Sequence, residues 1–298
     1  MPLITVFTPT FNRGYIISNL FESLKRQTCK DFEWLIIDDG STDNTRDRVL
    51  SFQSDDTCDF SIRYYHKKNG GKPRAINDGL SKSNGKYFFM VDSDDYLLEN
   101  AIEKLKTWIF EIDSMDDIVG VGAARAFPNM QYIKGVPPKI DDYLDASNLD
   151  RGKYDLDADM CEAYKVEIIK KYPFVVWPGE TFSPEEIVLN DMALDGYKIR
   201  WHRDIIYICD YLEDGLTKGQ WGLLKKNPMG YAMLYNNKLK YSKTFKDKIY
   251  NSSQMIALSM IGNNINYILE SNSLLHTILS VPLGVILYFR RKGQFKYD

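Results

Sequence analysis

Histidine and cysteine are scarce in this chain, and neither is spaced as a set of metal ligands. Its 298 residues include three histidines, with no HxH or HxxxH pair, which argues against a zinc site. The four cysteines form no CxxC pair and are widely separated, at Cys29, Cys58, Cys161 and Cys209. We therefore expect free thiols in a reducing cytoplasm.

Signatures of several other protein classes are also absent. The chain has no GxxxxGK[ST] loop, which argues against a P-loop nucleotidase. It has no GxGxxG after the first predicted strand, which argues against a nicotinamide enzyme. Met1-Pro2-Leu3 leads directly into a strand-like segment instead of a basic leader, so we expect no signal peptide.

The composition is that of a globular protein, with 44% hydrophobic, 27% charged and 13% aromatic residues. The net charge of −3 is unevenly distributed. Residues 216–298 contain 12 Lys or Arg and three Asp or Glu, or +9, so residues 1–215 carry −12. This basic C-terminal quarter predicts contact with an anionic surface.

Two hydrophobic periods alternate along the first 110 residues. Short apolar runs predict strands over Leu3–Thr8, Glu33–Ile37, Ser61–His66 and Lys86–Val91. Helical spacing of apolar residues predicts helices over Tyr15–Thr28, Asn44–Gln53, Pro73–Ser83 and Leu98–Phe110. Strand and helix repeated in this way predict an α/β fold around a mainly parallel mixed sheet.

The rest of the chain is less regular and becomes helical toward its end. We predict strands over Asp117–Ala126 and Lys198–Ile208, and helices over Cys161–Lys171 and Glu185–Leu194. Beyond residue 215 we predict helices over Gly219–Lys240 and Phe245–Leu269. A final apolar stretch covers Ser273–Phe289 and is followed by Arg290-Arg291-Lys292.

The apolar run Tyr87–Val91 ends abruptly in Asp92-Ser93-Asp94-Asp95. Crowded carboxylates repel one another unless a positive charge neutralises them, and a hard divalent cation takes oxygen ligands. The carboxyl edge of a parallel sheet is also where open α/β folds bind ligands. This pattern favours a cation site. The alternative is a strand followed by an Asp- and Ser-rich turn.

Two further polar turns follow strands on the same edge of the predicted sheet. Asp38 and Asp39 close the second strand and can accept hydrogen bonds from a base or a ribose. The alternative is turn chemistry and helix capping by Ser41 or Asp43. The two interpretations are compatible, because capping by Ser41 and Asp43 leaves Asp38 and Asp39 free. Asn69-Gly70-Gly71-Lys72 can hold phosphate oxygens at a helix start, or it is a solvated surface loop.

Taken together, these segments resemble the nucleotide-sugar domain of family-2 glycosyltransferases, inverting enzymes with the A-type glycosyltransferase fold. The resemblance covers roughly residues 1–110 and follows the family's order and spacing. It is carried by Val6–Arg13 (VFTPTFNR), Gln27-Thr28 before Asp31-Phe32-Glu33, Leu35–Asn44 (LIIDDGSTDN), Gly70–Leu80 (GGKPRAINDGL) and Phe88–Asp95 (FFMVDSDD).

The resemblance implies a Rossmann-like donor site. It implies that Thr8 and Pro9, with Asp38 or Asp39, hold the nucleoside, usually uridine. Asp92 and Asp94 become the DxD pair, which with Ser93 between them touches the ribose and binds Mn²⁺ or Mg²⁺ on the diphosphate.

One position departs from the family pattern. Many members carry an arginine where this chain has Ile76, and Lys72 or Arg74 is expected to replace it in binding the diphosphate.

The resemblance also implies a catalytic base at a helix start after the DxD strand. The matching segment is Pro184-Glu185, which makes Glu185 the preferred base, with Glu186 and Asp191 as rivals. The alternative is an ordinary N-cap, N1 proline and acidic first turn. By the same resemblance Asp159, Glu162 and Glu180 line the acceptor pocket, with Asp159 and Glu162 opening a helix.

We therefore predict a catalytic domain over residues 1–215, with a nucleotide-binding half (1–110) and an acceptor half (111–215), and a helical, basic region over 216–298. The predicted activity is metal-dependent transfer from a nucleotide sugar, such as a UDP-sugar, to a saccharide or lipid-linked saccharide in surface polysaccharide synthesis. The alternatives are a sugar nucleotidyltransferase and a non-catalytic nucleotide-sugar-binding module.

We expect no nucleic-acid partner and a cytoplasmic location at the inner membrane face. The apolar stretch Ser273–Phe289 has 17 residues and contains Pro282 and Gly284, so a membrane-surface helix fits better than a span. Peripheral contact through residues 273–296 is predicted. The alternative is a helix packed on the catalytic domain. His202 lies in a predicted strand, and we expect a packed or exposed strand histidine. The alternative is that His202 approaches the metal or the diphosphate.

Overall fold

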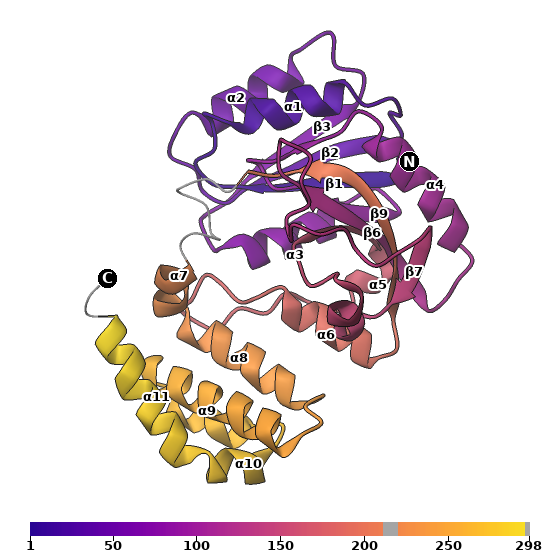
Figure 1. Cartoon of the computed structure of the whole chain (residues 1–298). Coiled ribbons are helices and arrows are strands. Elements are labelled where there is room, and N and C mark those ends of the chain that lie inside the picture. The colour runs from indigo at the N-terminus through magenta and orange to yellow at the C-terminus, as the bar shows by residue number, and fades with distance from the viewer. Residues whose placement is uncertain (211–219, 296–298) are drawn as a thin grey trace. The chain divides into compact units, whose positions relative to one another are not determined.

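The structure is a computed structural model that describes residues 1–210 and 220–295 (Figure 1). By their internal contacts these residues form two compact units. Unit 1 comprises Met1–Pro173 and Asp195–Asp210, and unit 2 comprises Phe174–Leu194 with the described residues from 220 onward. The division into a catalytic domain (1–215) and a C-terminal region (216–298) stays a prediction.

Unit 1 is built on a mixed sheet with the order β3-β2-β1-β4-β8-β6-β9-β5, and β7 pairs with β9 (Figure 1). The first four of its strands in the chain run parallel: β1 (Ile4–Thr10), β2 (Phe32–Asp38), β3 (Ser61–His66) and β4 (Tyr87–Met90). The other strands are β5 (Tyr96–Leu97), β6 (Ile118–Ala126), β7 (Tyr143–Ala146), β8 (Met160–Lys165) and β9 (Lys198–Ile208).

Strand β8 joins the two halves of this sheet. It pairs antiparallel with β4 on one side and with β6 on the other. Beyond it, β6 and β9 are parallel, while β5 and β7 pair antiparallel with β9. This pairing puts the carboxyl ends of β4, β6 and β9 near one another.

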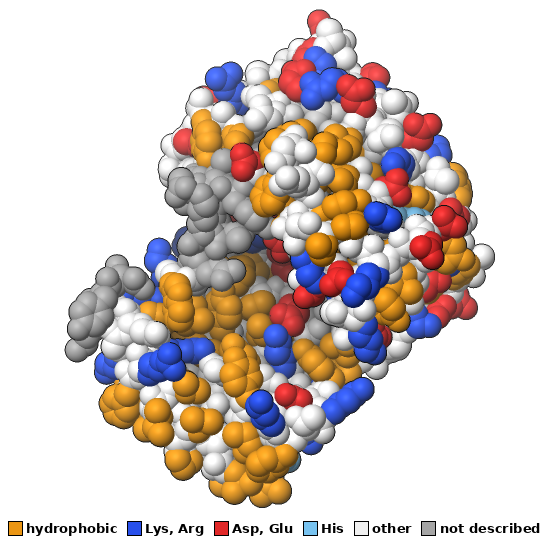
Figure 2. All heavy atoms as spheres, in the orientation of Figure 1, with side chains coloured by type: hydrophobic (Ala, Val, Ile, Leu, Met, Phe, Trp, Pro, Cys, Tyr) orange, Lys and Arg blue, Asp and Glu red, His pale blue; other side chains and the backbone are white. Residues whose placement is uncertain are grey.

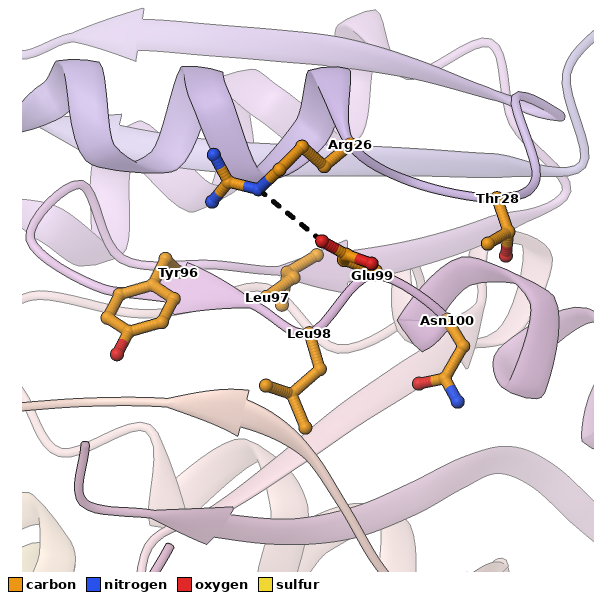
Figure 3. A pocket seen from close by; sticks show the side chains of 7 residues that line it. All are labelled: Arg26, Thr28, Tyr96, Leu97, Leu98, Glu99 and Asn100. Carbon is orange, nitrogen blue, oxygen red and sulfur yellow. Dashed lines mark ion pairs between the residues drawn. The ribbon is translucent and has the colours of Figure 1, made fainter. Parts of the chain in front are cut away.

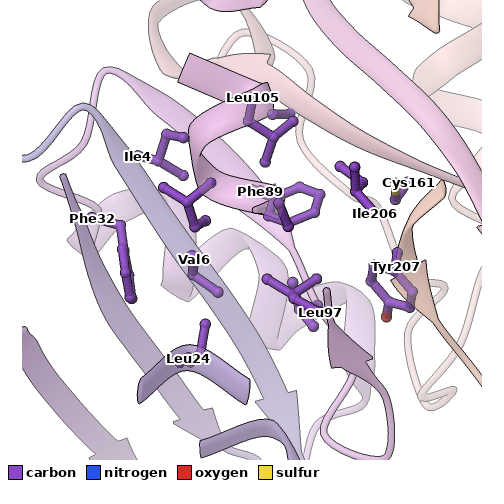
Figure 4. Packing of buried hydrophobic residues seen from close by; sticks show 14 of the residues in the cluster. Ile4, Val6, Leu24, Phe32, Phe89, Leu97, Leu105, Cys161, Ile206 and Tyr207 are labelled. Carbon is purple, nitrogen blue, oxygen red and sulfur yellow. The ribbon is translucent and has the colours of Figure 1, made fainter. Parts of the chain in front are cut away.

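Helices connect the parallel strands in the predicted order. In unit 1 they are α1 (Ile17–Lys25), α2 (Thr45–Gln53), α3 (Lys72–Lys82), α4 (Ala101–Ile112), the 3-10 helix η1 (Asn148–Tyr154) and α5 (Val166–Ile169). The apolar faces of α1, α2 and α4 pack on the sheet and form a core with it. Figure 4 shows a part of this core, in which residues of β1, β4, α1, α4 and β9 meet, among them Val6, Leu24, Phe89, Leu105 and Tyr207.

Unit 2 is helical. It contains α6 (Glu186–Leu194), α7 (Gln220–Lys226), α8 (Pro228–Leu239), α9 (Phe245–Ile261), the 3-10 helix η2 (Ile265–Glu270), α10 (Leu274–Leu279) and α11 (Val281–Gln294). Its core includes Met229 and Ala232 of α8 and Met255 and Leu258 of α9. None of the described helices is both long and apolar enough to cross a lipid bilayer.

The predicted helix over Cys161–Lys171 is wrong in its first half. Residues Met160–Lys165 form the strand β8, and only Val166–Ile169 is helical. Consequently Asp159 and Glu162 do not open a helix. A short apolar run does not by itself distinguish a buried strand from a helix, and here pairing with two neighbouring strands decides.

Three predicted C-terminal helices are each interrupted. The segment 219–240 divides into α7 and α8 at Asn227, because Pro228 begins a new helix. The segment 245–269 changes from α9 to η2 after Gly262 and the left-handed Asn263 (φ 52°). The stretch 273–289 is two helices, α10 and α11, with Pro282 in the first turn of the second.

A glycine of α3 provides a test of packing in unit 1. A Cβ on Gly79 would lie 2.2 Å from a ring atom of Phe7, whose ring stacks on Phe88 at 4.8 Å. We expect Gly79→Ala to lower the free energy of unfolding by about 1–3 kcal/mol, because overpacking outweighs the gain in helix propensity. Urea unfolding measures this change.

The matched control is Gly152→Ala in η1, where a Cβ would meet nothing within 4 Å. Its expected change is below about 0.5 kcal/mol. Equal stability of Gly79→Ala and the unmodified chain would contradict the packing described for α3.

Candidate active site

The four residues Asp92–Asp95 follow β4 at its carboxyl end and lead into β5. Three basic side chains reach this acidic cluster from other elements of unit 1. They are Arg13 after β1, Lys72 at the start of α3 and Arg125 near the end of β6. The site is therefore a group of mixed charge and not a bare set of carboxylates.

Asp92 lies between two of these cations. Lys72 Nζ is 2.9 Å from Asp92 Oδ1, and Arg125 Nη1 is 3.8 Å from Asp92 Oδ2. Burial raises the pKa of Asp92, but Lys72, Arg125 and Arg13 outweigh that effect and hold the pKa below its usual value. Asp92 is thus an ionised carboxylate at neutral pH.

Asp95 is buried and bound to Tyr207 of β9. The Tyr207 hydroxyl donates to Asp95 Oδ2 at 2.6 Å and accepts from the Asp92 backbone N–H at 2.9 Å. Burial and the nearby Asp92 raise the pKa of Asp95 to about 8, with Arg125 and Tyr207 opposing the shift. Tyr207 therefore links the turn that contains Asp92 and Asp95 to strand β9.

Arg125 is almost enclosed by these groups. Its Nη1 lies 3.9 Å from Asp95 Oδ2, and its guanidinium carbon is 4.2 Å from the centre of the Tyr207 ring. The Nε of Arg125 is buried without a hydrogen-bond partner among the described residues. The guanidinium thus serves as an internal counterion for the ionised Asp92.

Asp94 is more open than Asp95 and pairs loosely with Arg13, whose Nε is 3.7 Å from Asp94 Oδ2. Burial and the charge of Asp92 raise the pKa of Asp94, and Arg13 opposes this. The rise means that Arg13 and Lys72 do not fully offset burial and the charge of Asp92 at this carboxyl group. An added cation would favour the ionised form.

The donor atoms of Asp92 and Asp94 suit a hard dication such as Mn²⁺ or Mg²⁺. Across residues 1–210 and 220–295, no group of three or more His, Cys, Asp or Glu side chains is arranged to hold a metal. A Mg²⁺-type ion is often bound by one or two carboxylates, with substrate phosphates and water completing its shell. The two aspartates fit that kind of site and not an all-protein cage.

Asp38 and Asp39 are both engaged within the protein, in contrast to our expectation that they are free. Asp38 accepts from the Ser41 N–H at 2.8 Å and the Tyr64 hydroxyl at 2.5 Å. Asp39 accepts from the N–H groups of Gly70 and Gly71 at 2.9 and 2.6 Å. Asp39 therefore shapes the loop that leads into α3.

The predicted nucleoside contacts on β1 and after β4 lie in buried backbone. Thr8 is fully buried, and its hydroxyl accepts from Trp34 Nε1 at 3.0 Å. Pro9 and Ser93 are also buried. The hydroxyl of Thr10, opposite Asp38 in the sheet, is buried with no partner among the described residues. Thr10 is thus a polar group at this edge, and it belongs to the predicted family motif Val6–Arg13.

The proposed base and its rivals belong to unit 2. Glu185 immediately precedes α6, and its carbonyl accepts the Val188 N–H at 3.0 Å. Glu186 is 3.1 Å from Lys238 Nζ, and Asp191 is 2.8 Å from Lys240 Nζ. Both rivals are therefore committed to ion pairs with α8 or the residue that follows it.

Two of the predicted acceptor-pocket residues have structural partners. Glu180 accepts from the N–H groups of Met229 and Gly230, both at 2.8 Å, and so caps the start of α8. Glu162 lies 3.5 Å from Arg151 Nη1.

His202 packs on Trp108 with ring centres 4.0 Å apart and an angle of 8°. Burial lowers its pKa to about 4. His202 is therefore a packed strand histidine, as we expected first.

A surface pocket lies beside β5, just beyond Asp95 in the sequence (Figure 3). It contains an ion pair of 3.9 Å between Arg26 and Glu99 and none of the predicted site residues. Its lining is Arg26, Thr28, Tyr96, Leu97, Leu98, Glu99 and Asn100.

Sequence reasoning missed Arg125 and Tyr207 because both lie far from Asp92 along the chain. The only local signal is Arg125 itself, a charged residue in the otherwise apolar strand segment Ile118–Ala126. An arginine is rarely buried unless it is paired, so its position could have indicated a carboxylate partner.

A family model described as glycosyl transferase family 2 matches residues 5–172. The chain belongs to this family. The predicted family and the enzyme class, a glycosyltransferase, are thereby confirmed.

Two curated glycosyltransferases match a part of this family-2 chain. Glycosyltransferase GlyG of Streptococcus pneumoniae is 37% identical over 119 residues, or 40% of this chain and 38% of GlyG. The GalNAc(5)-diNAcBac-PP-undecaprenol beta-1,3-glucosyltransferase of Campylobacter jejuni is 35% identical over 107 residues, or 35% and 34% of the two chains. The matches thus span less than two fifths of either relative's length.

Solved structures extend the similarity to the whole chain. TarS 1–349 of S. aureus, in complex with UDP-GlcNAc, has a TM-score of 0.62 at 17% identity and covers 100% of this chain and 92% of its own. The mannosyltransferase PcManGT from Pyrobaculum calidifontis, in complex with GDP-Man and Mn²⁺, has a TM-score of 0.57 at 15% identity and covers 98% and 83%. At these identities the similarity concerns the fold, and the predicted α/β fold with C-terminal helices is confirmed.

The bridging hydroxyl of Tyr207 can be tested by removing it alone. Tyr207→Phe leaves the Asp92 N–H without its acceptor and buried Asp95 without its donor. We expect the free energy of unfolding to fall by about 1–3 kcal/mol in urea titrations. The control is Tyr132→Phe, whose exposed hydroxyl lies 3.4 Å from the Arg203 carbonyl. A Tyr207→Phe variant as stable as this control would refute the bridging role.

The buried His202 predicts a pH dependence of stability. Its folded pKa of about 4 is below the ordinary 6.5, so the unfolded chain binds the proton more tightly. The contribution of His202 to the free energy of unfolding is fully present above pH 6.5 and is lost as the pH falls toward 4. Over that range His202→Phe should lose less stability than the unmodified chain, by up to about 3 kcal/mol. Exposed His66→Asn is the control, and equal pH slopes for all three chains would contradict the prediction.

Proposed function

We propose that this family-2 protein is an inverting glycosyltransferase that moves a sugar from a UDP-sugar to a hydroxyl of a saccharide or lipid-linked saccharide, in surface polysaccharide synthesis. Support comes from the names of similar proteins, since TarS was solved with UDP-GlcNAc and the Campylobacter relative is named for an undecaprenol-linked acceptor. We propose a cytoplasmic location, with peripheral membrane contact through residues 273–296, of which 296 lies outside the described residues.

The observation that carries the proposal is the mixed-charge group at the carboxyl end of β4. Asp92 and Asp94 offer carboxylate oxygens, while Lys72, Arg125 and Arg13 supply positive charge within 4 Å of one or the other. A nucleoside diphosphate carries several negative charges and binds a dication. A site with both signs of charge suits such a complex better than a site with one sign.

In the proposed reaction the acceptor hydroxyl attacks the anomeric carbon of the donor sugar. The new bond forms to the acceptor oxygen, the bond to the diphosphate oxygen breaks, and the configuration inverts. The hydroxyl proton passes to a carboxylate base, for which we propose Glu185. The leaving nucleoside diphosphate departs with the electron pair of the broken bond.

A divalent cation held by Asp92 and Asp94 would supply charge for the leaving diphosphate. Lys72 now pairs with Asp92, one of the two carboxylates that would hold such a cation. We propose that Lys72 pairs instead with a diphosphate oxygen when donor is bound. Its place in the first turn of α3 favours an anion there, because backbone N–H groups point the same way.

Nucleoside binding is proposed for the polar edge formed by β1 and β2. Thr8, Pro9 and Ser93 would contribute backbone groups and shape, because they are buried. Asp38 and Asp39 would act through the loops that they hold, unless a ligand displaces one of their present donors.

The test is release of UDP from a panel of UDP-sugars by the purified full chain, with and without Mn²⁺ or Mg²⁺. We expect metal-dependent hydrolysis of at least one donor, with water as the acceptor. Asp94→Asn should lower that rate by roughly a hundredfold or more, because it removes a metal ligand. Exposed Asp56→Asn is the matched control and should keep the full rate.

The base assignment is tested in the same assay. Glu185→Gln should lower the rate by about 10²–10⁴-fold while UDP binding, measured by calorimetry, stays unchanged. Glu186→Gln, whose native carboxylate pairs with Lys238, should change little. UDP-sugar binding without any turnover would leave only a binding module, and pyrophosphate release from UTP and a sugar phosphate would favour the nucleotidyltransferase.

A further inference from the structure

Helices α10 and α11 of unit 2 turn an apolar face to the outside. Six side chains make up this outer face, each 42–68% exposed, namely Leu275, Ile278, Leu279, Leu283, Ile286 and Phe289. Their spacing of three or four residues places them on one side of the two consecutive helices. Figure 2 shows hydrophobic side chains gathered over this part of unit 2.

The opposite face of the same helices is small or polar and is buried against α9. The Thr277 hydroxyl donates to Ser252 Oγ at 3.2 Å. The Ser280 hydroxyl lies 2.7 Å from the His276 carbonyl of α10 and 3.3 Å from the Ile249 carbonyl of α9. A Cβ on Gly284 would lie 2.6 Å from Ile256, so the backbones are in close contact there.

This polarity is the reverse of that expected for a helix in water. A surface helix of a globular protein places its apolar stripe inward and its polar residues outward. Here Thr277 and Ser280 are each 1% exposed, while the six apolar residues of the outer face are open. Six apolar side chains exposed on one side of two consecutive helices indicate an interaction surface.

Basic side chains adjoin the end of the outer face. Arg290 and Lys292 of α11 and Lys225 and Lys226 of α7 are exposed, and Lys225 Nζ donates to the Phe295 carbonyl at 2.7 Å. Glu270 is the only acidic residue between positions 261 and 295. This charge complements anionic lipid headgroups, whereas a second copy of the chain would bring the same positive charge with it.

Length favours helices that lie in the membrane surface. The 14 residues of α11 extend about 21 Å, short of the roughly 30 Å hydrocarbon core of a bilayer. An amphipathic helix with basic flanks and apolar side chains on one face instead lies at the boundary of headgroups and acyl chains.

We propose that the outer face of α10 and α11 docks on an anionic lipid bilayer, with both helices parallel to its surface. The six apolar side chains enter the acyl boundary, and Arg290 and Lys292 meet lipid phosphates. The inference deepens the proposed function, on which its relevance to a lipid-linked acceptor rests. Lipid binding and donor hydrolysis are nevertheless separate measurements.

The test is flotation of the full chain with vesicles of phosphatidylcholine alone or with about one third phosphatidylglycerol. We expect binding to the anionic vesicles, weakened by salt. Ile278→Gln/Ile286→Gln should weaken binding about tenfold or more, since each substitution removes an apolar side chain that would enter the acyl boundary. Arg290→Gln/Lys292→Gln should weaken it by roughly tenfold at low salt and less at high salt.

The matched control is Leu50→Gln/Phe110→Gln in unit 1, which removes two apolar side chains of similar exposure (41% and 64%) and should bind as the unmodified chain does. Failure of the unmodified chain to float with anionic vesicles overturns the proposal, and so does equal binding by the Ile278/Ile286 variant. A concentration-dependent dimer that this variant abolishes would instead assign the face to a second copy.

Donor hydrolysis without vesicles separates this proposal from the enzymatic one. Variants of the outer face should keep the UDP-sugar hydrolysis rate of the unmodified chain while losing vesicle binding. Circular dichroism spectra identical to that of the unmodified chain would show that they are folded.

Discussion

The ion pair of Arg125 with Asp92, beside the buried Asp95, is the interaction on which the arrangement of the site depends. A buried guanidinium and an ionised carboxylate are each costly to remove from water, and they are tolerated together because each offsets the other. Tyr207 completes the group by bonding both the Asp95 side chain and the Asp92 backbone. Strands β4, β6 and β9 are thus tied together at the edge where the cluster lies.

A second carboxylate organises the other side of this edge. Asp39, at the end of β2, accepts hydrogen bonds from Gly70 and Gly71 and so fixes the loop before α3. Lys72 follows directly and reaches Asp92 at 2.9 Å. Asp39 therefore positions the loop that carries Lys72, and Asp92 forms the ion pair with the Lys72 ammonium group. Charge at the site is arranged by contacts between segments that no single motif contains.

The two units differ in which kinds of side chain they bury. In unit 1 an apolar sheet is enclosed by the apolar faces of its helices, and polar groups gather at one edge. In unit 2 a share of the interior is polar, with Asn251, Ser252 and Gln254 of α9 buried, while leucines, isoleucines and a phenylalanine are exposed on α10 and α11. Asn251 donates to Ser242 and Ser252 accepts from Thr277, so these buried polar side chains have hydrogen-bond partners, while the apolar outer face is exposed.

The sequence by itself determined the α/β class of unit 1, the family and the acidic cluster after β4, because strand and helix periods and the Asp92–Asp95 motif are local features. It did not determine that residues 160–165 form a central strand, since a short apolar run fits either period until its neighbours are known. Only the tertiary structure decided that Asp92 has Lys72 and Arg125 as counterions. Those pairs join residues 20 to 33 positions apart, and Tyr207 comes from more than 100 positions away. Likewise, the composition of residues 274–290 could indicate an amphipathic segment, but packing on α9 decided which side faces outward.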